Sequence, residues 1–467
     1  MRFKDAKDTF FEFWSEFRKV KYGMVGLVMF VLFLLIVIFE SVLIPFPETG
    51  RRWRDITYWE DNPKNAAPVW VNWFTRKRSA PHLVLDAAEF NEKKAANTQM
   101  VEAVFKYDYA YDLPPLDLLL RAKGKGLINL VVQLERPDGL RIELVKKAIR
   151  LNSEAPIRLS LDKEAASASS NFLQTYEDPA ALRSISMFTV KPVETFFACA
   201  EQGLVRNPIP LKGEYRLKLT SVAVGGGAAL TDPSLTVAGR VFGVMGTDAS
   251  KRDLWSGVIA GTKWALLIGL LTSAVSVLIG VFYGVTSAYF GGAVDLVMMR
   301  IYEVFQSIPL LPVMIVVSAI FKPSIWTMIL MMCSFFWVSS VRTVRSMGLQ
   351  IKEETYVEAA QALGATRRRI IFKHMLPQLI PYAFASMALQ VPVSIVYEAS
   401  VSLLGLGDAT IVTWGQILHD AMQGGAVLQG LWWWIVPPGL FIALMGMTFA
   451  FVGFAMDTIL NPKLRTR

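Results

Sequence analysis

The residues with the most distinctive chemistry form a polar, cationic segment, residues 356–381, inside a sequence that is otherwise rich in apolar side chains. Its first part favours a short helix with an apolar face, and Gly364 stands where such a helix can end in a left-handed turn. A second helix is expected to follow and to end before Pro377 and Pro381. The cations of this second helix are Arg367, Arg368, Arg369 and Lys373. Such a charged segment between apolar runs indicates contact with a soluble component.

One simpler interpretation of this segment is open. A basic cluster next to a membrane span commonly contacts lipid headgroups, so an amphipathic hairpin on the membrane surface is one alternative. His374 does not indicate a metal site, because no Cys, His or carboxylate lies at metal-ligand spacing from it. The sequence also lacks a GxxxxGK[ST] phosphate loop. We therefore expect no metal, no bound cofactor and no enzymatic activity in this chain.

Six uncharged runs predict an all-α polytopic membrane protein. The 467 residues are 53% hydrophobic and only 19% charged, which is too apolar for a soluble protein of this length. A membrane helix needs about 17 to 25 apolar residues. The runs cover residues 23–39, 264–290, 304–321, 323–341, 375–397 and 421–456. The first needs extension to Ile44 to reach this length, and the second and sixth are long enough to include re-entrant or interfacial pieces.

The cations that flank these runs predict the orientation of the chain. Lys and Arg concentrate on the cytoplasmic side of membrane proteins, so both termini and the loop 342–373 are expected in the cytoplasm. The flanking cations are Arg2, Lys4, Lys7, Arg18, Lys19 and Lys21 before the first run, and Lys463, Arg465 and Arg467 after the last. No small-residue cleavage site follows the first run, so it should remain as an anchor in the cell (inner) membrane. The net charge of +9 then needs no nucleic-acid partner.

Residues 45–240 form a long polar segment, which predicts a large inserted α+β or all-β domain outside the cytoplasm. Two apolar runs on either side of Pro137 and Gly139 predict a β-hairpin over residues 128–145. The two cysteines, Cys199 and Cys333, fall in different parts of the chain, so no disulfide is expected within the insertion. The other expected elements are strands at 155–162 and 213–224, helices at 173–183 and 193–202, irregular structure near the headgroups at 51–78, and a flexible joint at 225–227 that returns the chain to the membrane.

The cationic segment resembles the EAA loop of binding-protein-dependent ABC importer permeases. Residues 353–377 carry the spacing of that loop at Glu358, Ala359, Ala360, Gly364, Leu376 and Pro377. Three further stretches are similar to motifs of the dipeptide, oligopeptide and nickel permeases of the second, or C, type: GTDASKRDLWSG at 246–257, AYFGGAVDLVMMR at 288–300, and YEASVSLLGLGD at 397–408 followed by WGQIL at 414–418. LNPKLR at 460–465 resembles the ending of these permeases. Lys251 and Gly257 depart from the family pattern, which commonly has Gly and Arg at these two positions.

Each motif also carries a local structural expectation. Thr247 or Asp248 can cap a short interfacial helix, with Arg252 and Asp253 paired to each other or facing water. Gly291 and Gly292 predict a tight turn, followed by Asp295 near a helix N-terminus and by an Arg300–Glu303 pair. Pro437 to Gly439 are expected to kink or reset the last helix, and Trp432 to Trp434 to form an interfacial aromatic belt.

The resemblance implies a role for each of these motifs. In such permeases the EAA segment rests in a groove of a cytoplasmic ATPase, which assigns ATPase coupling to Glu358, Ala359, Ala360, Gly364, Arg367, Arg368, Leu376 and Pro377. It implies an extracytoplasmic motif at Gly246, Thr247, Asp248 and Asp253. Glu398 is expected either on the translocation path or gate, or in a satisfied structural hydrogen bond. The implied partners are a second permease, two ATPase subunits or domains that hold ATP and Mg, an extracytoplasmic binding protein and membrane lipid.

The resulting plan has three parts: residues 1–44 as the cytoplasmic N-terminus and first span, residues 45–240 as the insertion, and residues 241–467 as the permease core. Di- or oligopeptides are the first expectation for the substrate, with nickel and oligosaccharides as alternatives within the same class. An ion-coupled secondary transporter would need intramembrane carboxylates and internal repeats. The sequence has few carboxylates in its apolar runs and no evident repeat. A membrane-anchored receptor is the third possibility.

Overall fold

The computed structural model describes residues 14–95, 98–151, 157–183, 191–224 and 229–460. The chain divides into two compact units, which we call the sheet unit (residues 55–255) and the helical unit (residues 1–54 and 256–467). The sheet unit therefore begins and ends later in the chain than the expected insertion at 45–240. Several sequence expectations lie outside the described residues: the cations before residue 14 and after residue 460, most of the C-terminal LNPKLR motif, and the glycine joint at 225–227.

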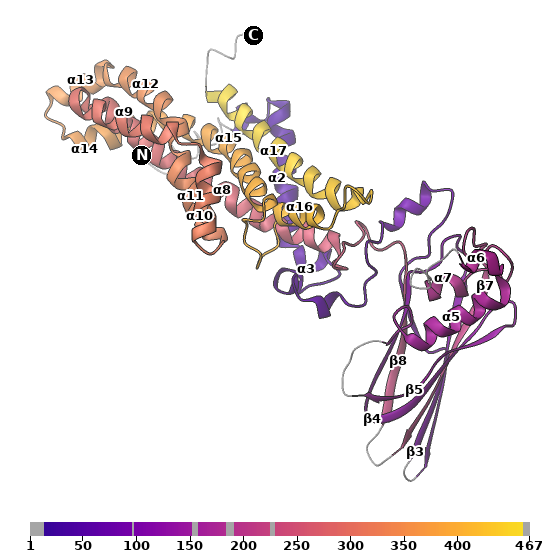
Figure 1. The fold of residues 1–467 in the computed structure, drawn as a ribbon. Helices are drawn as coiled ribbons and strands as arrows, with labels where there is room; N and C mark the ends of the chain where they lie inside the picture. The colour runs from indigo at the N-terminus through magenta and orange to yellow at the C-terminus, as the bar shows by residue number, and fades with distance from the viewer. Residues whose placement is uncertain (1–13, 96–97, 152–156, 184–190, 225–228, 461–467) are drawn as a thin grey trace. The chain divides into compact units, whose positions relative to one another are not determined.

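The sheet unit contains an antiparallel sheet (Figure 1). Its strand order is β1-β8-β4-β7-β3-β2, with β5 and β6 paired to β4. Its long central strand β4 pairs with β8 along its first half and with β7 and β5 along its second half. The strands are β1 (Leu83–Asp86), β2 (Glu89–Ala95), β3 (Thr98–Tyr109), β4 (Asp117–Glu135), β5 (Arg141–Leu151), β6 (Ile157–Arg158), β7 (Gly213–Val224) and β8 (Ala229–Ala238).

Alternation of side chains along the strands builds the core of this unit. Every second residue of β3 from Val101 to Tyr109 is buried, as expected for a strand with one face covered. Helices α5 (Lys163–Tyr176) and α7 (Pro192–Phe196) contribute Phe172, Leu173 and Phe196 to the same core. A third, short helix is α6 (Pro179–Arg183). The unit is thus α+β.

The predicted hairpin at 128–145 is confirmed as the β4–β5 pair, with Gly139 at φ +82° in its turn. The strand at 213–224 is confirmed as β7, whereas the strand at 155–162 is only the two-residue β6 in its described part. The helix expected at 173–183 was misplaced, because α5 already begins at Lys163, where Asp162 accepts a hydrogen bond from the Glu164 amide and caps it. The helix expected at 193–202 is the shorter α7.

Strand β8 follows residues 225–227 and pairs with β4, so the sheet continues beyond the position where the chain was expected to leave it. Residues 51–78 contain short helical turns rather than wholly irregular structure: the end of α4 (Thr49–Arg52), then η1 (Ile56–Trp59) and η2 (Val69–Trp73).

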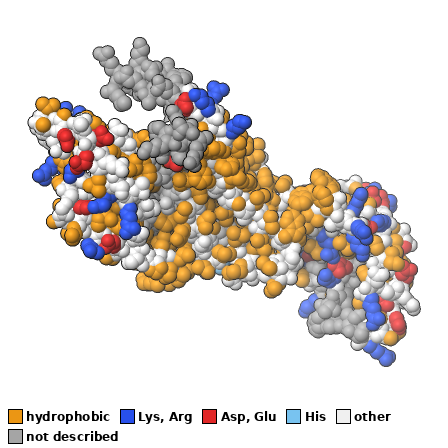
Figure 2. Space-filling model, turned by 90° about the horizontal axis from the view of Figure 1, so that it is seen from above, with side chains coloured by type: hydrophobic (Ala, Val, Ile, Leu, Met, Phe, Trp, Pro, Cys, Tyr) orange, Lys and Arg blue, Asp and Glu red, His pale blue; other side chains and the backbone are white. Residues whose placement is uncertain are grey.

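Among its described residues, the helical unit contains five helices long and apolar enough to cross a membrane, and a sixth span if the bent pair α9 and α10 counts as one. These two meet at 75°. Hydrophobic side chains cover much of this unit, and charged ones gather at the end that carries α13 and α14 (Figure 2). The helices of the spans are α2 (Lys21–Ile38), α8 (Leu254–Phe290), α9 (Gly292–Ser307), α10 (Leu310–Ile320), α11 (Ile325–Phe336) with α12 (Val338–Lys352), α15 (Leu376–Leu403) and α17 (Trp432–Leu460).

Three details of the spans differ from expectation. Helix α2 starts at Lys21 and reaches 18 residues alone; it stops at Phe39, and residues 40–43 form a separate short helix α3 (Glu40–Leu43). The second run holds no re-entrant piece, because α8 is one helix of 37 residues. At 1.5 Å per residue that is about 55 Å, so α8 extends beyond a hydrocarbon core of about 30 Å. Helix α17 continues through Pro437 and Pro438.

Glycines allow the closest helix contacts in the helical unit. A Cβ atom at Gly280 or Gly284 of α8 would lie within 3 Å of atoms of α12, and one at Gly23 or Gly26 of α2 would meet α17 in the same way. Small residues let backbones approach closely in membranes, where packing rather than the hydrophobic effect drives helix association. These contacts fix α12 on α8, and α2 on α17.

Candidate functional site

The EAA segment forms a helical hairpin with a defined corner. Helix α13 (Thr355–Ala362) ends in two hydrogen bonds, from the Gly364 amide to the Gln361 carbonyl (2.9 Å) and from the Ala365 amide to the Ala360 carbonyl (3.0 Å). This is the Schellman arrangement, and Gly364 has the left-handed φ of +79° that it requires. The left-handed turn predicted at Gly364 is therefore confirmed.

The second helix of the hairpin continues into the membrane span. Thr366 caps α14 (Arg367–Arg369) by accepting from the Arg369 amide (3.4 Å), and a π-helical stretch, η4 (Ile370–Met375), leads directly into α15. The expectation that this helix ends before Pro377 was wrong, because Pro377 lies in the first turn of α15, which follows η4 without a break. Leu376 and Pro377 thus join the hairpin to the span.

One face of the hairpin is buried and the other is open. Val357 is the buried residue of α13, and it packs with Ile370, Ile371 and Met375 in one apolar cluster that α8 and α12 also enter. Glu358, Ala359, Arg367 and Arg368 are exposed, and Ala360 is half-buried. Leu363, at the corner, is 88% exposed. The hairpin is therefore held at its base while an apolar corner and a charged face stay uncovered.

Aromatic contacts tie the hairpin to the end of α8. The Arg367 guanidinium lies 5.6 Å from the centroid of the Phe290 ring, a cation–π distance. The Phe372 and Phe282 rings are 5.8 Å apart. The His374 ring lies 6.3 Å from Tyr356, on the neighbouring helix of the hairpin. A movement of the hairpin would consequently be transmitted to α8 as well as to α15.

The glycine turn before α9 has the predicted form. Gly291 and Gly292 have φ of +60° and +50°, and Asp295 lies in the first turn of α9. Arg300 and Glu303 pair at 2.6 Å. Sequence reasoning missed the main partner of Asp295, the Arg345 guanidinium of α12, which donates through Nε (2.7 Å) and through Nη2. This bidentate pair joins α9 to α12 just before the hairpin.

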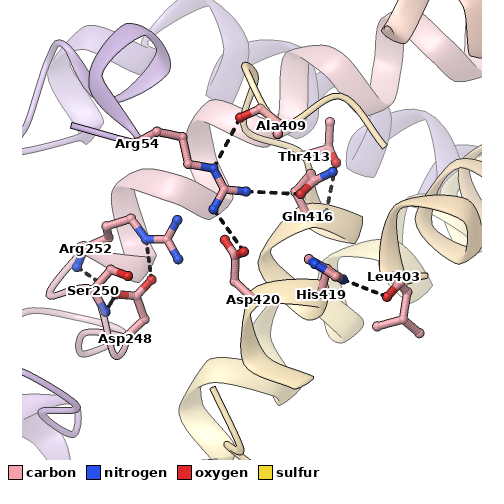
Figure 3. Close-up of polar contacts among 10 residues, drawn as sticks. All are labelled: Arg54, Asp248, Ser250, Arg252, Leu403, Ala409, Thr413, Gln416, His419 and Asp420. Carbon is pink, nitrogen blue, oxygen red and sulfur yellow. Dashed lines mark hydrogen bonds and ion pairs between the residues drawn. The ribbon is translucent and has the colours of Figure 1, made fainter. Parts of the chain in front are cut away.

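The GTD motif of the sheet unit stabilises a turn rather than a short helix. The Thr247 hydroxyl donates to the Pro63 carbonyl (2.7 Å) and accepts from the Ala66 amide (2.9 Å). Asp248 accepts from the Ser250 and Arg252 amides, and its other oxygen pairs with the Arg252 side chain at 2.5 Å (Figure 3). Both Asp248 and Arg252 are buried. The alternative expectation, that Arg252 faces water, is therefore wrong.

The two departures from the family pattern have structural explanations. Lys251 takes φ of +65°, the left-handed conformation that Gly adopts without strain and that costs other residues about 1 kcal/mol. Its ammonium donates to the Glu60 carbonyl (2.9 Å), and burial lowers its pKa to about 8. At Gly257 a Cβ atom would lie 2.5 Å from the Trp53 ring, which leaves no room for the Arg that the family commonly has there.

Glu398 is 3% exposed and hydrogen-bonded within the helical unit. Its carboxylate accepts from Ser402 (2.7 Å), one turn along α15, and from Thr413 (2.8 Å), which also caps α16 (Trp414–Gln423). Of the two alternatives for this residue, the satisfied hydrogen bond is present in the structure. Glu398 thereby fixes the start of α16 against the end of α15.

Arg54 is a polar anchor that the sequence did not single out. Its guanidinium donates to the Ala409 carbonyl (3.2 Å), to Gln416 (3.2 Å) and to Asp420 (3.0 Å), so it links the segment after α4 to α16 (Figure 3). The only signal for it was a cation followed by Asp55 in a Trp-rich stretch. The expected belt at Trp432 to Trp434 is also incomplete, because Trp434 is only 1% exposed and packs on Gly424.

Within the described ranges, no group of three or more His, Cys, Asp or Glu side chains could hold a metal ion. The motifs instead lie at two places on the helical unit and one on the sheet unit, and all of them hold helices or turns in position. Such an arrangement suits transmission of movement.

Comparison with known proteins agrees with this geometry. Residues 253–466 match the model of the family described as binding-protein-dependent transport system inner membrane component. Residues 9–68 match the N-terminal TM domain of oligopeptide transport permease C. The dipeptide transport system permease protein DppC of Bacillus subtilis is 37% identical over 221 residues, which cover 47% of this chain and 68% of that protein. The chain belongs to this permease family.

Two other relatives give similar values. The oligopeptide transport system permease protein OppC of Haemophilus influenzae is 35% identical over 47% of this chain and 70% of its own length. The probable D,D-dipeptide transport system permease protein DdpC of Escherichia coli is 31% identical over 47% of this chain and 72% of its own. Neither family model covers residues 69–252 of the permease, which include most of the sheet unit.

Proposed function

We propose that this permease is one membrane subunit of an ATP-driven importer of di- or oligopeptides and contributes half of the translocation path. Family membership supports the importer class, and the names of the dipeptide and oligopeptide relatives support the substrate. The partners in this proposal are a second permease, two ATPase subunits that carry ATP and Mg, and an extracytoplasmic binding protein. The chain lies in the cell (inner) membrane with six spans and both termini in the cytoplasm.

The single observation that carries the coupling role is the half-open hairpin at residues 353–377. Its buried base includes Val357 and joins α8, α12 and α15, whereas its outer face keeps Leu363 and Glu358 uncovered. A partner that covers Leu363 would remove its apolar surface from water, which is favourable. Closure of an ATPase on this face would move α13 and the start of α15 together and alternate access to the path.

The experiment is co-purification of the permease with its ATPase subunits, followed by measurement of peptide-stimulated ATP hydrolysis and peptide uptake. Glu358→Lys should reduce ATPase association or uncouple hydrolysis from uptake. Glu201→Lys makes the same charge change at an exposed site of the sheet unit and serves as the control. Unchanged association and coupling in Glu358→Lys would leave Glu358 as a solvated helix residue. Transport of Ni²⁺ or an oligosaccharide in place of peptides would overturn the substrate class.

A further inference from the structure

The sheet unit has a pocket of about 450 Å³ that none of the family motifs uses. We call it the sheet pocket. Its lining includes the cations Arg76, Lys77 and Arg240 and the acids Asp112 and Glu194. Phe197, which is buried, provides an apolar wall together with neighbouring Leu and Pro side chains. Small-molecule sites have volumes of about 300 to 1,000 Å³ and combine apolar walls with a few charged groups.

Hydrogen bonds hold the loop that carries Arg76 and Lys77. The Asn72 side chain donates to the Ser79 carbonyl and accepts from the Ser79 amide, both at 2.9 Å, so it closes the loop 72–79. The Arg78 amide donates to the Asp112 carboxylate (2.8 Å), and the Asp112 amide donates to the Arg78 carbonyl (2.8 Å). This wall of the sheet pocket is therefore formed before any ligand arrives.

The part of the wall around Phe197 is also fixed by backbone bonds. The Leu211 amide donates to the Phe197 carbonyl (2.9 Å), and the Cys199 amide donates to the Ile209 carbonyl (2.8 Å). The Phe197 ring stacks on Tyr215 with centroids 4.3 Å apart. A preformed pocket loses less entropy on binding than one that must be assembled.

The charges of the sheet pocket are not balanced. Asp112 is paired with Lys212 (2.7 Å), and Glu194 is paired with Lys191 (3.1 Å) and with Arg240. Arg76 and Lys77 form no hydrogen bond or ion pair with the part of the chain that the structure describes. Two cations thus line the pocket without an ion-pair partner, which favours an anionic group there. A carboxylate with an apolar body suits the combination of these cations with the apolar wall at Phe197.

We propose that the sheet pocket binds the terminal carboxylate of a short peptide, with Arg76 and Lys77 on the carboxylate and Phe197 against an apolar side chain of the ligand. This proposal rests on the proposed function for the peptide class and adds a binding site on the permease chain itself. The sheet unit would then take part in substrate capture rather than serve only as a packing domain.

The test is calorimetric titration of the full-length permease in nanodiscs with the dipeptide alanyl-phenylalanine. The C-terminally amidated dipeptide should bind at least tenfold more weakly than the free acid, and N-acetylation should have little effect. Arg76→Ala/Lys77→Ala should raise the Kd of the free acid at least tenfold. Lys93→Ala/Lys218→Ala removes two exposed cations of β2 and β7 that do not line the pocket and should bind normally.

Three results would overturn the proposal: no binding of the free acid at millimolar concentration, equal binding of the acid and its amide, or normal binding by Arg76→Ala/Lys77→Ala. Competition by acetate or inorganic phosphate as effective as by the dipeptide would also overturn it, because the site would then be a general anion site. Peptide uptake by the assembled importer is measured separately. Uptake without pocket binding refutes only the sheet pocket, whereas pocket binding without peptide uptake refutes only the proposed transport.

Discussion

Gly364 has a left-handed backbone conformation and no neighbouring atoms near the position of a Cβ, so a substitution there tests the backbone conformation alone. Its φ is +79°, and a Cβ atom built there would meet nothing within 4 Å. A substitution therefore acts through the backbone and not through a clash. A β-branched residue held in this conformation costs about 1 to 3 kcal/mol, whereas Asn tolerates it more readily.

Gly364→Val should consequently misdirect the corner of the hairpin and strongly reduce ATP-driven uptake, while the amount of permease in the membrane stays normal. Gly364→Asn is the matched control and should keep most of the uptake. The measurement is uptake normalised to permease abundance. Equal uptake by the Val and Asn variants would show that the conformation at this corner does not matter for coupling.

His82 of the sheet unit gives a pH-dependent prediction. Burial lowers its pKa from 6.5 to about 4; nearby Asp61 opposes this shift and Lys251 adds to it. Its ring packs edge-on to Phe242, with centroids 5.1 Å apart. Between pH 6.5 and 4 the unfolded chain binds a proton at this position and the folded chain does not, so the free energy of unfolding falls as the pH falls through this range.

His82→Phe should therefore reduce the acid sensitivity of the sheet unit between pH 6.5 and 4. The measurement is the midpoint of thermal unfolding at pH 7 and at pH 4.5, followed by the circular-dichroism signal of the sheet. The loss of stability between these two pH values should be smaller in the variant than in the wild-type chain. An identical loss in both would mean that other groups set the acid response.

At the scale of elements, the helices of the permease core depend on glycines at their contacts. A Cβ atom at Gly284 of α8 would lie 2.8 to 2.9 Å from atoms of Val341 and Val344 on α12. One at Gly439 of α17 would meet nothing within 4 Å. Replacing Gly by Ala inside a helix raises the free energy of unfolding by about 1 kcal/mol when the new methyl group has room. Whether the methyl group meets a neighbouring helix therefore decides if the substitution stabilises or destabilises the permease.

Gly284→Ala should lower the thermal unfolding midpoint of the detergent-solubilised permease by several degrees, and Gly439→Ala should leave it unchanged or raise it slightly. Because α12 leads into α13, Gly284→Ala should also reduce uptake. The prediction is wrong if the two variants unfold at the same temperature, since α8 and α12 would then separate readily to accept the methyl group.

The sequence predicted elements well where one local signal dominates. The hairpin around Gly139 and the left-handed corner at Gly364 are set by turn chemistry, and both are present. The prediction failed for contacts that depend on a residue far along the chain. The sequence spacing could not predict that Arg345 pairs with Asp295 or that Arg54 binds α16. Such partners are far apart in the chain and meet only in the folded structure.

Proline was a misleading signal in the membrane helix α15. Pro377 was expected to end a helix, yet α15 contains it. Pro437 was expected to kink or reset the last helix, and α17 continues through it, so the reset is absent. In a membrane span the alternative to a helix is unpaired backbone in hydrocarbon, which costs several kcal/mol per group, so one missing bond is tolerated. Strands β1, β2, β3 and β8 were missed. Of these, β2 is mostly polar and β1 has only four residues.

At the scale of the whole molecule, the orientation of the sheet unit decides which partners it can meet. The proposed topology places the hairpin in the cytoplasm and the sheet unit on the opposite side of the membrane, since long polar domains are translocated largely regardless of their own charge. The described residues offer one exposed position on each unit for a test: Ser167 on α5 and Gln361 on α13. The native Cys333 is buried in α11, and Cys199 is half-buried in the sheet unit.

In a chain with both native cysteines replaced, Ser167→Cys should react with a membrane-impermeant maleimide on intact cells, and Gln361→Cys should react only after the membrane is opened. The measurement is the labelled fraction of each variant before and after permeabilisation. Because the two sites lie on different units and carry the same probe, each is the control for the other. The reverse pattern would place the sheet unit in the cytoplasm and remove the hairpin from any ATPase; the sheet pocket could then bind only peptides that had already entered the cell.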